Sequence, residues 1–189
     1  MTTVADTTKS RSKPLGEPPS ELLGEPLKHR LEACHADSFG WALACSAGDL
    51  DLAEEALSTT YLKVLEGRAR FAGRSRFKTW LFGVIRLSVV ELRRRRAWRR
   101  FVPVEWLAEA EDPQPPRSST IVEDEESANL RRALGALGER QRQVLHLVFY
   151  QEMTVEDASS VLGIGVGTAR THYQRGKSRL RRLLEETTP

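Results

Sequence analysis

The positions of the nine prolines constrain what this 189-residue chain can fold into more than any other feature of its sequence. Proline lacks a backbone N–H group and interrupts α-helices. Apart from the final residue, the prolines lie in two stretches: Pro14, Pro18, Pro19 and Pro26 near the start, and Pro103, Pro113, Pro115 and Pro116 in the middle. Two long blocks without proline remain, and these can be mostly helical. We therefore predict four segments: a disordered tail (residues 1–30), a helical domain (31–101), a linker (102–126) and a second helical domain (127–185).

Apolar residues recur every three or four positions in both blocks, which is the spacing of amphipathic helices. In the first block, Asp51 and Glu54 resemble a capping box, and Ser75 can cap a long helix. The residues expected to face the core from that long helix are Phe77, Trp80, Leu81, Val84, Leu87 or Ser88, and Leu92. In the second block, one helix is expected to place four residues inward: Val144, Leu145, Val148 and Phe149. No stretch reads as a strand, so we expect an all-α protein with two small helical domains.

Charge is distributed unevenly along the chain. Residues 67–100 carry twelve Lys or Arg and a single acidic residue, Glu91, while residues 164–184 carry six basic residues and no acidic one. Between them, residues 102–126 carry eight Asp or Glu and one basic residue, Arg117. Two basic blocks suggest two surfaces for nucleic acid, joined by an acidic tether that avoids this ligand or mimics it. Solvated helix surfaces are the alternative reading of both basic runs.

Several other classes of protein fit the sequence poorly. No apolar run approaches the roughly 20 residues that span a bilayer, and the N-terminus has no signal-peptide core, so we expect a cytoplasmic protein without membrane insertion. Cys34 and Cys45 are too few for a disulfide framework and are read as small buried residues. A zinc site is the alternative, but the spacings of its candidate ligands fit no standard motif: His29, Cys34, His35 and Cys45. We predict no metal, no cofactor and no catalytic residue.

The stretch "LGIGVG", residues 162–167, can be read as a phosphate-binding glycine loop or as the turn of a helix-turn-helix. A phosphate loop directly follows a β-strand. Here the preceding segment opens with Thr154 and Asp157, a second capping-box pattern, and is expected to be a helix that ends at Gly163. The context therefore favours a helix-turn-helix, whose second helix starts at Val166.

This second helix has one side that can pack and one side that is small, polar and basic. The packing side consists of Val166, Ala169, Tyr173, Gly176 and Leu180. The polar side suits a DNA major groove, where arginine can bridge guanine and glutamine can bridge adenine. The expected base-reading residues are Arg170, Gln174 and Arg175, with Thr171 and Ser178 for bases or phosphates and Lys177 for phosphates. A solvated amphipathic helix is the alternative.

Both blocks also resemble a known family. The stretch "LGALGERQRQVLHLVFYQEMTVEDASSVLGIGVGTARTHYQRGKSRLRRLL" resembles region 4 of bacterial RNA polymerase sigma-70 family factors of the extracytoplasmic-function (ECF) group. The stretch "FAGRSRFKTWLFGVIRLSVVELRRRR" looks like regions 2.3 and 2.4, and "LAEEALSTTYLKV" lies where the family has "DAEDLVQEVFLRV". The resemblance covers roughly residues 33–100 and 127–184. It implies a dissociable polymerase subunit with sigma2-like and sigma4-like domains joined by a flexible linker.

The resemblance implies a function and a set of site residues. The sigma4-like helix-turn-helix would read the minus-35 element of a promoter, and the sigma2-like domain would read and help open the minus-10 element. The implied minus-10 residues are Arg74, Arg76, Lys78, Arg86, Leu87, Arg93 and Arg94. The residues implied to bind the clamp of the largest polymerase subunit are Glu54, Glu55, Ser58, Thr59 and Leu62. Further implied partners are the flap of the second largest subunit and an anti-sigma factor.

Three departures from the family pattern carry expectations of their own. Leu87 stands where the family often has Asn, which is expected to change the minus-10 preference. On the helix implied to bind the polymerase clamp, Ser58, Thr59 and Thr60 stand where the family has an acidic residue. Binding to the clamp should therefore be weaker, unless phosphorylation restores the negative charge. Gly165 stands where serine is usual and is expected to act as a weaker helix N-cap.

Two other functions stay open at the level of sequence. A stand-alone repressor or activator is favoured if the first block does not bind polymerase. A DNA-processing enzyme would need a metal-binding carboxylate cluster or a nucleophile with its base. For the acidic linker, a strand threaded toward the polymerase active site and a plain spacer are both consistent with the composition.

Overall fold

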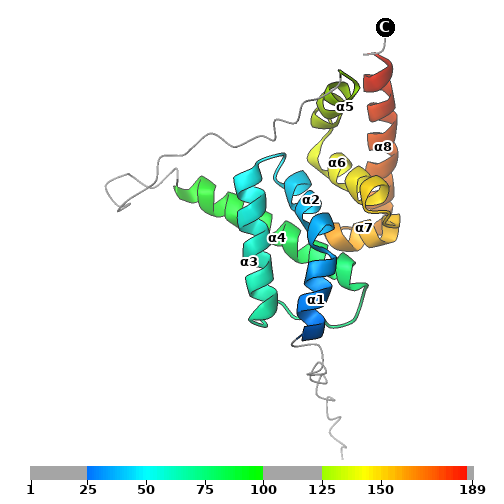
Figure 1. The fold of residues 1–189 in the computed structure, drawn as a ribbon. Helices are drawn as coiled ribbons and strands as arrows, with labels where there is room; N and C mark the ends of the chain where they lie inside the picture. Colours follow the sequence, from blue (N-terminus) through cyan, green and yellow to red (C-terminus); the bar gives the residue numbers. More distant parts are fainter. Residues whose placement is uncertain (1–24, 100–124, 187–189) are drawn as a thin grey trace, which may run out of the picture.

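The computed structural model describes residues 25–99 and 125–186, and every regular element within these ranges is a helix (Figure 1). The first block contains α1 (Glu25–Ala33), α2 (His35–Cys45), α3 (Leu50–Leu65) and α4 (Phe77–Arg99). The second block contains α5 (Glu125–Gly135), α6 (Glu139–Leu145), the π-helix η3 (His146–Tyr150), α7 (Val155–Leu162) and α8 (Val166–Glu185). The predicted all-α class is confirmed.

The predicted segment boundaries shift at two places. Helix α1 begins at Glu25, so residues 25–30, which we predicted to be disordered, are helical. Pro26 is compatible with this because it occupies the first turn, where a backbone N–H has no intrahelical acceptor. Helix α5 likewise begins at Glu125, two residues inside the predicted linker. The predictions for residues 1–24 and 102–124 lie outside the described residues.

The helix starts in the first block differ from the capping patterns read in the sequence. Asp49, rather than Asp51, caps α3, because its side chain accepts a hydrogen bond from the backbone N–H of Leu52 at 2.9 Å. The Ser75 hydroxyl does not cap α4 among the described hydrogen bonds; it donates to the carbonyl of Arg76 at 3.2 Å. Both differences depend on where the preceding loop places each side chain.

The core of the first block is built around Trp41 of α2, which is fully buried. Its indole N–H donates to the carbonyl of Phe82 in α4 at 2.9 Å, which satisfies the one polar atom of the side chain. Helix α4 contributes a continuous buried row to the same core: Leu81, Phe82, Ile85, Val89 and Leu92. Of the two residues predicted as alternatives for one core position, Ser88 is buried and Leu87 is exposed.

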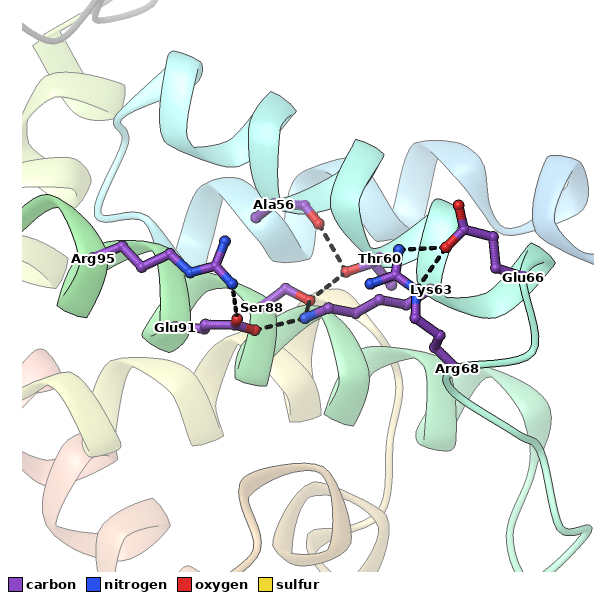
Figure 2. A network of polar contacts seen from close by, with 8 residues as sticks. All are labelled: Ala56, Thr60, Lys63, Glu66, Arg68, Ser88, Glu91 and Arg95. Atoms are coloured by element: carbon purple, nitrogen blue, oxygen red, sulfur yellow. Dashed lines mark hydrogen bonds and ion pairs between the residues drawn. The ribbon is translucent and has the colours of Figure 1, made fainter. Parts of the chain in front are cut away.

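A polar contact joins α3 to α4 within this core (Figure 2). The buried Thr60 hydroxyl donates to the Ala56 carbonyl at 2.7 Å and shares a 3.0 Å hydrogen bond with the Ser88 hydroxyl. At the edge of the contact, the Lys63 ammonium reaches Ser88 at 3.3 Å and the Glu91 carboxylate at 2.7 Å. The hydrogen bond from Lys63 lowers the pKa of Glu91. The two helices are therefore held in register by hydrogen bonds as well as by apolar packing.

The two blocks pack against each other, with α7 of the second block lying across α4 of the first (Figure 1). Val161 and Leu162 of α7 belong to the same buried cluster as the residues of the first block. The Thr79 hydroxyl lies 3.3 Å from the Asp157 carboxylate, and the rings of Trp41 and His146 lie 5.6 Å apart. The sequence indicated two domains but not this shared interface.

Candidate nucleic-acid interface

Helix α7 and the turn after it have the local structure that the sequence predicts. The Thr154 hydroxyl accepts a hydrogen bond from the backbone N–H of Asp157 at 3.0 Å, which caps the first turn. Gly163 ends the helix in the left-handed conformation, with φ 63° and ψ 40°. The backbone N–H groups of Gly163 and Ile164 return to the carbonyls of Ser160 and Ser159, the pattern of a glycine C-cap.

Helix α8 follows α7 after three residues, Gly163 to Gly165, so that α7 and α8 form a helix-turn-helix (Figure 1). Gly165 is the N-cap residue of α8, as predicted, and offers no side-chain hydrogen bond to the first turn. The helix packs onto α6 at Gly176, where an added Cβ would lie 3.2 Å from atoms of Gln141 and Leu145. Since the segment before "LGIGVG" is a capped helix, the phosphate-loop alternative does not fit the structure.

The recognition face of α8 is open to solvent. Every residue predicted to meet DNA from this helix is exposed: Arg170, Thr171, Gln174, Arg175, Lys177 and Ser178. Ala169 and Gly176, on the opposite side, are buried. The helix thus presents a small, polar and basic surface of the kind that enters a major groove.

Arg170 is held in place by a residue that the sequence did not single out. Its guanidinium lies 2.7 Å from the carboxylate of Glu156 in α7, and both side chains are more than half exposed. This hydrogen bond lowers the pKa of Glu156. The two residues are fourteen positions apart and face each other only because the turn folds α8 back across α7.

The basic residues predicted on and before α4 do not form one open surface. Arg74, Arg76 and Arg94 are exposed, as is Leu87. Lys78 instead binds Asp37 at 2.8 Å, and Arg93 binds Glu139 of the second block at 3.3 Å. Arg86 is half-buried; burial lowers the pKa of its guanidinium, and the nearby charge of Arg140 lowers it further.

The aromatic residues beside this surface pack against one another. Phe71, Phe77 and Trp80 have ring centroids 5.3–5.5 Å apart. Arg30 of α1 covers them, with its guanidinium 4.1 Å from the centre of the Phe77 ring. Phe77 is buried, so it belongs to the hydrophobic core rather than to an open stacking platform.

The residues predicted on α3 to bind polymerase lie along one outward face. Glu54, Glu55, Ser58 and Leu62 are exposed and Thr59 is half-buried. Glu55 forms an ion pair with Arg96 of α4 at 2.6 Å. Thr60 is buried and hydrogen-bonded inside the protein, so among the three hydroxyls considered for phosphorylation it is the one that this fold hides from solvent.

Comparisons with known proteins agree with these two helical units. Residues 32–99 match the family model of sigma-70 region 2, and residues 127–180 match that of sigma-70 region 4. The chain is 31% identical over 160 residues to the RNA polymerase sigma factor CarQ of Myxococcus xanthus, covering 82% of this chain and 88% of that protein. The chain is an ECF sigma factor of the sigma-70 family.

Other relatives support the same assignment for this sigma factor. It is 30% identical over 163 residues to the ECF RNA polymerase sigma factor EcfG of Rhodopseudomonas palustris, covering 86% of this chain and 87% of that protein. Its fold is similar to that of the sigma factor RpoE from Bartonella quintana, solved in complex with the anti-sigma factor NepR. The TM-score is 0.66 at 22% identity, over 87% of this chain and all of that one.

The thiols of this sigma factor form no disulfide. Cys34 is half-buried and Cys45 is buried, and burial raises the pKa of Cys45 to about 12. Across residues 25–99 and 125–186, no group of three or more His, Cys, Asp or Glu side chains is arranged to hold a metal ion. Within the same ranges, no helix is long and apolar enough to cross a membrane.

Proposed function

We propose that this sigma factor binds core RNA polymerase and directs it to promoters by reading two DNA elements with its two helical units. One observation carries the proposal: a well-formed helix-turn-helix with an open basic recognition face lies in the same chain as a second basic helix, α4. Two separate DNA-reading surfaces in one polypeptide suit a two-part promoter better than a single operator.

For the minus-35 element, we assign base contacts to three exposed side chains of α8. Arg170 and Arg175 can each bridge a guanine, and Gln174 can bridge an adenine. Thr171 and Ser178 lie on the same face, and Lys177 is suited to phosphates. The Thr171 hydroxyl donates to the Gly167 carbonyl at 3.0 Å, so it would have to exchange this partner to donate to a phosphate.

For the minus-10 element, we assign α4 and the loop before it. Arg74, Arg76 and Arg94 are accessible for phosphate contacts as the protein stands. Three further basic side chains could contact the DNA only after they leave a present partner or after the second block moves away: Lys78, Arg86 and Arg93. Full engagement of the minus-10 DNA is therefore expected to require that the second block separates from α4.

The outward face of α3 is assigned to the clamp of the largest polymerase subunit. It combines the carboxylates of Glu54 and Glu55 with the apolar side chain of Leu62, which is 54% exposed. Ser58 and Thr59 lie between them and complete the surface. By family likeness, the second block would bind the flap of the second largest subunit, and an anti-sigma factor is a further partner, as in the RpoE complex. The sigma factor itself acts in the cytoplasm and leaves catalysis to the polymerase.

The test is transcription in vitro from a library of random promoters, with cognate core polymerase in the presence and absence of this protein. We expect starts that depend on the protein and lie downstream of a shared two-part motif. A protein with Arg170→Ala and Gln174→Ala should lose selection at the upstream half of the motif only. Tight binding to a duplex site without any dependent starts would instead identify a stand-alone repressor.

A further inference from the structure

Three consecutive arginines near the end of α4 have three different environments. Arg94 is exposed, and the guanidinium of Arg95 binds Glu91 on its own helix at 2.6 Å (Figure 2). Arg96 instead forms ion pairs with side chains at the start of α3 and at its N-cap. Of these three arginines, Arg96 is therefore the one that joins the two helices.

Arg96 lies between two carboxylates. Its Nη2 atom is 2.6 Å from Glu55 Oε2, and its Nη1 atom is 3.5 Å from Asp49 Oδ2. The other Asp49 oxygen accepts the N-cap hydrogen bond from Leu52 at 2.9 Å. The Glu55 side chain is the more exposed of the two carboxylates, at 47% against 24% for Asp49. The shorter contact is thus also the one that a partner molecule can reach.

Glu55 is also part of the face of α3 that we assign to the polymerase clamp. Glu54 precedes it on this face, is exposed and forms no ion pair among the described residues. Two carboxylates on an open helix face attract a partner that carries positive charge. The Arg96 guanidinium repels such a partner and occupies an oxygen of Glu55 that the partner would need.

The fold does not depend on the contact between Arg96 and Glu55. An ion pair between side chains this exposed contributes little to stability. The register of α3 on α4 is held by the buried hydrogen bond between Thr60 and Ser88, 3.0 Å long, and by the apolar core. If Arg96 leaves Glu55, it also keeps a partner, because the Asp49 carboxylate remains beside it. The pair can therefore open at small cost.

We propose that Arg96 competes with the polymerase clamp for the Glu55 carboxylate, so that the free sigma factor masks part of its own polymerase-binding face. This inference rests on the proposed function, since it takes the clamp as the partner of α3. It adds that polymerase affinity is lowered by a residue of the same chain that lies outside the clamp-binding face. Binding to polymerase then exchanges an intramolecular ion pair for an intermolecular one.

The experiment measures equilibrium binding of labelled full-length protein to cognate core polymerase, without DNA and without an anti-sigma factor. Arg96→Gln removes the competing charge, so polymerase affinity should rise about twofold to fivefold, the range expected from an exposed ion pair. Glu55→Gln should lower affinity, because it removes the carboxylate for which both cations compete. In the Glu55→Gln background, Arg96→Gln should give no further gain, and this double-mutant cycle assigns the effect to the pair.

Two matched controls separate competition from a general effect of charge or of loosened packing. Arg95→Gln removes the same charge from the neighbouring position, but its partner Glu91 belongs to α4, so polymerase affinity should not change. Asp49→Asn retains an N-cap side chain for α3 and removes only the longer contact of Arg96. It should not raise affinity, whereas it would do so if a loosened start of α3 caused the gain.

Three results would overturn the inference and leave the proposed function intact. They are the absence of a gain in Arg96→Gln, a gain that persists in the Glu55→Gln background, and an equal gain in either control. A parent protein that does not bind core polymerase at all would refute the proposed function itself.

Discussion

The ion pair between Glu156 and Arg170 places a negative charge beside the face of α8 that we propose to bind DNA. The 2.7 Å contact holds the guanidinium over α7 and neutralises part of its charge. A surface pair of this kind contributes little to stability, typically about 0–1 kcal/mol. We therefore expect its main consequence on DNA binding, where it would orient Arg170 and hold a carboxylate close to the phosphates.

Replacing Glu156 by Gln should raise affinity for any duplex and reduce discrimination at the base read by Arg170. We expect nonspecific affinity to rise several-fold, because one repulsive charge is removed from the binding face. Fluorescence anisotropy with specific and mismatched minus-35 duplexes, at two salt concentrations, measures both effects. Glu152→Gln is the control, since it removes the same charge from an exposed turn outside the recognition face. Unchanged discrimination in Glu156→Gln would show that Arg170 is not positioned by this pair.

Two glycines of α8, Gly165 at its N-cap and Gly176 in its middle, differ in the space around them. The first lies in solvent, and the second packs against α6. Gly165, the N-cap residue, has room for a side chain: an added Cβ would meet the Thr168 hydroxyl at 3.9 Å. Gly176 has no such room, because Gln141 and Leu145 of α6 lie within 3.2 Å of the same atom. The first glycine leaves room for a side chain, and at the second a side chain would press on α6.

Replacing either glycine by serine should therefore change the free energy of unfolding in opposite directions. Gly165→Ser is expected to stabilise the protein by a few tenths of a kcal/mol, since a serine hydroxyl can accept from a free N–H of the first turn. Gly176→Ser is expected to destabilise it by about 1–3 kcal/mol through overpacking. Chemical denaturation measures both changes, and minus-35 binding should survive in Gly165→Ser. A loss of DNA binding in that variant would contradict the helix-turn-helix reading of "LGIGVG".

At the scale of the whole molecule, the two DNA-reading units share one buried cluster. His146 of the second block lies at this contact, with its ring 5.6 Å from that of Trp41 and 5.3 Å from that of Tyr150. Its Nε2 atom is buried and has no hydrogen-bond partner among the described residues. Burial lowers the pKa of His146 from 6.5 to about 4. The folded protein therefore favours the neutral form of this imidazole.

Stability should consequently fall as the pH drops from 7 toward 4. Below pH 6.5 the unfolded chain binds a proton at His146 that the folded chain excludes, so the unfolded state is favoured. Between pH 7 and 5 this costs about 2 kcal/mol of unfolding free energy. His146→Phe keeps an aromatic ring at the contact and should remove this part of the pH dependence, whereas His172→Phe should keep it. Identical pH profiles for the parent and His146→Phe would contradict a buried neutral histidine.

The sequence by itself determined the features of this protein that depend on residues close together in the chain. Proline placement and apolar spacing predicted two helical units, and Thr154 with Gly163 predicted the bounds of α7. These signals are reliable because caps and turns are made by side chains within about four residues of the backbone that they satisfy. The exposed face of α8 followed for the same reason, since a helix repeats every 3.6 residues.

Only the tertiary structure decided which equivalent-looking residues are buried and which charges are paired. Phe149 was predicted to face inward but is 56% exposed, because the π-helical turn adds a residue and rotates it away from the core. Leu87 and Ser88 were both candidates for one core position; Ser88 is buried and hydrogen-bonded to Thr60, whereas Leu87 is exposed. Arg93 and Glu139 are 46 residues apart and meet only when the two blocks pack. Such contacts depend on long-range geometry, which local spacing does not encode.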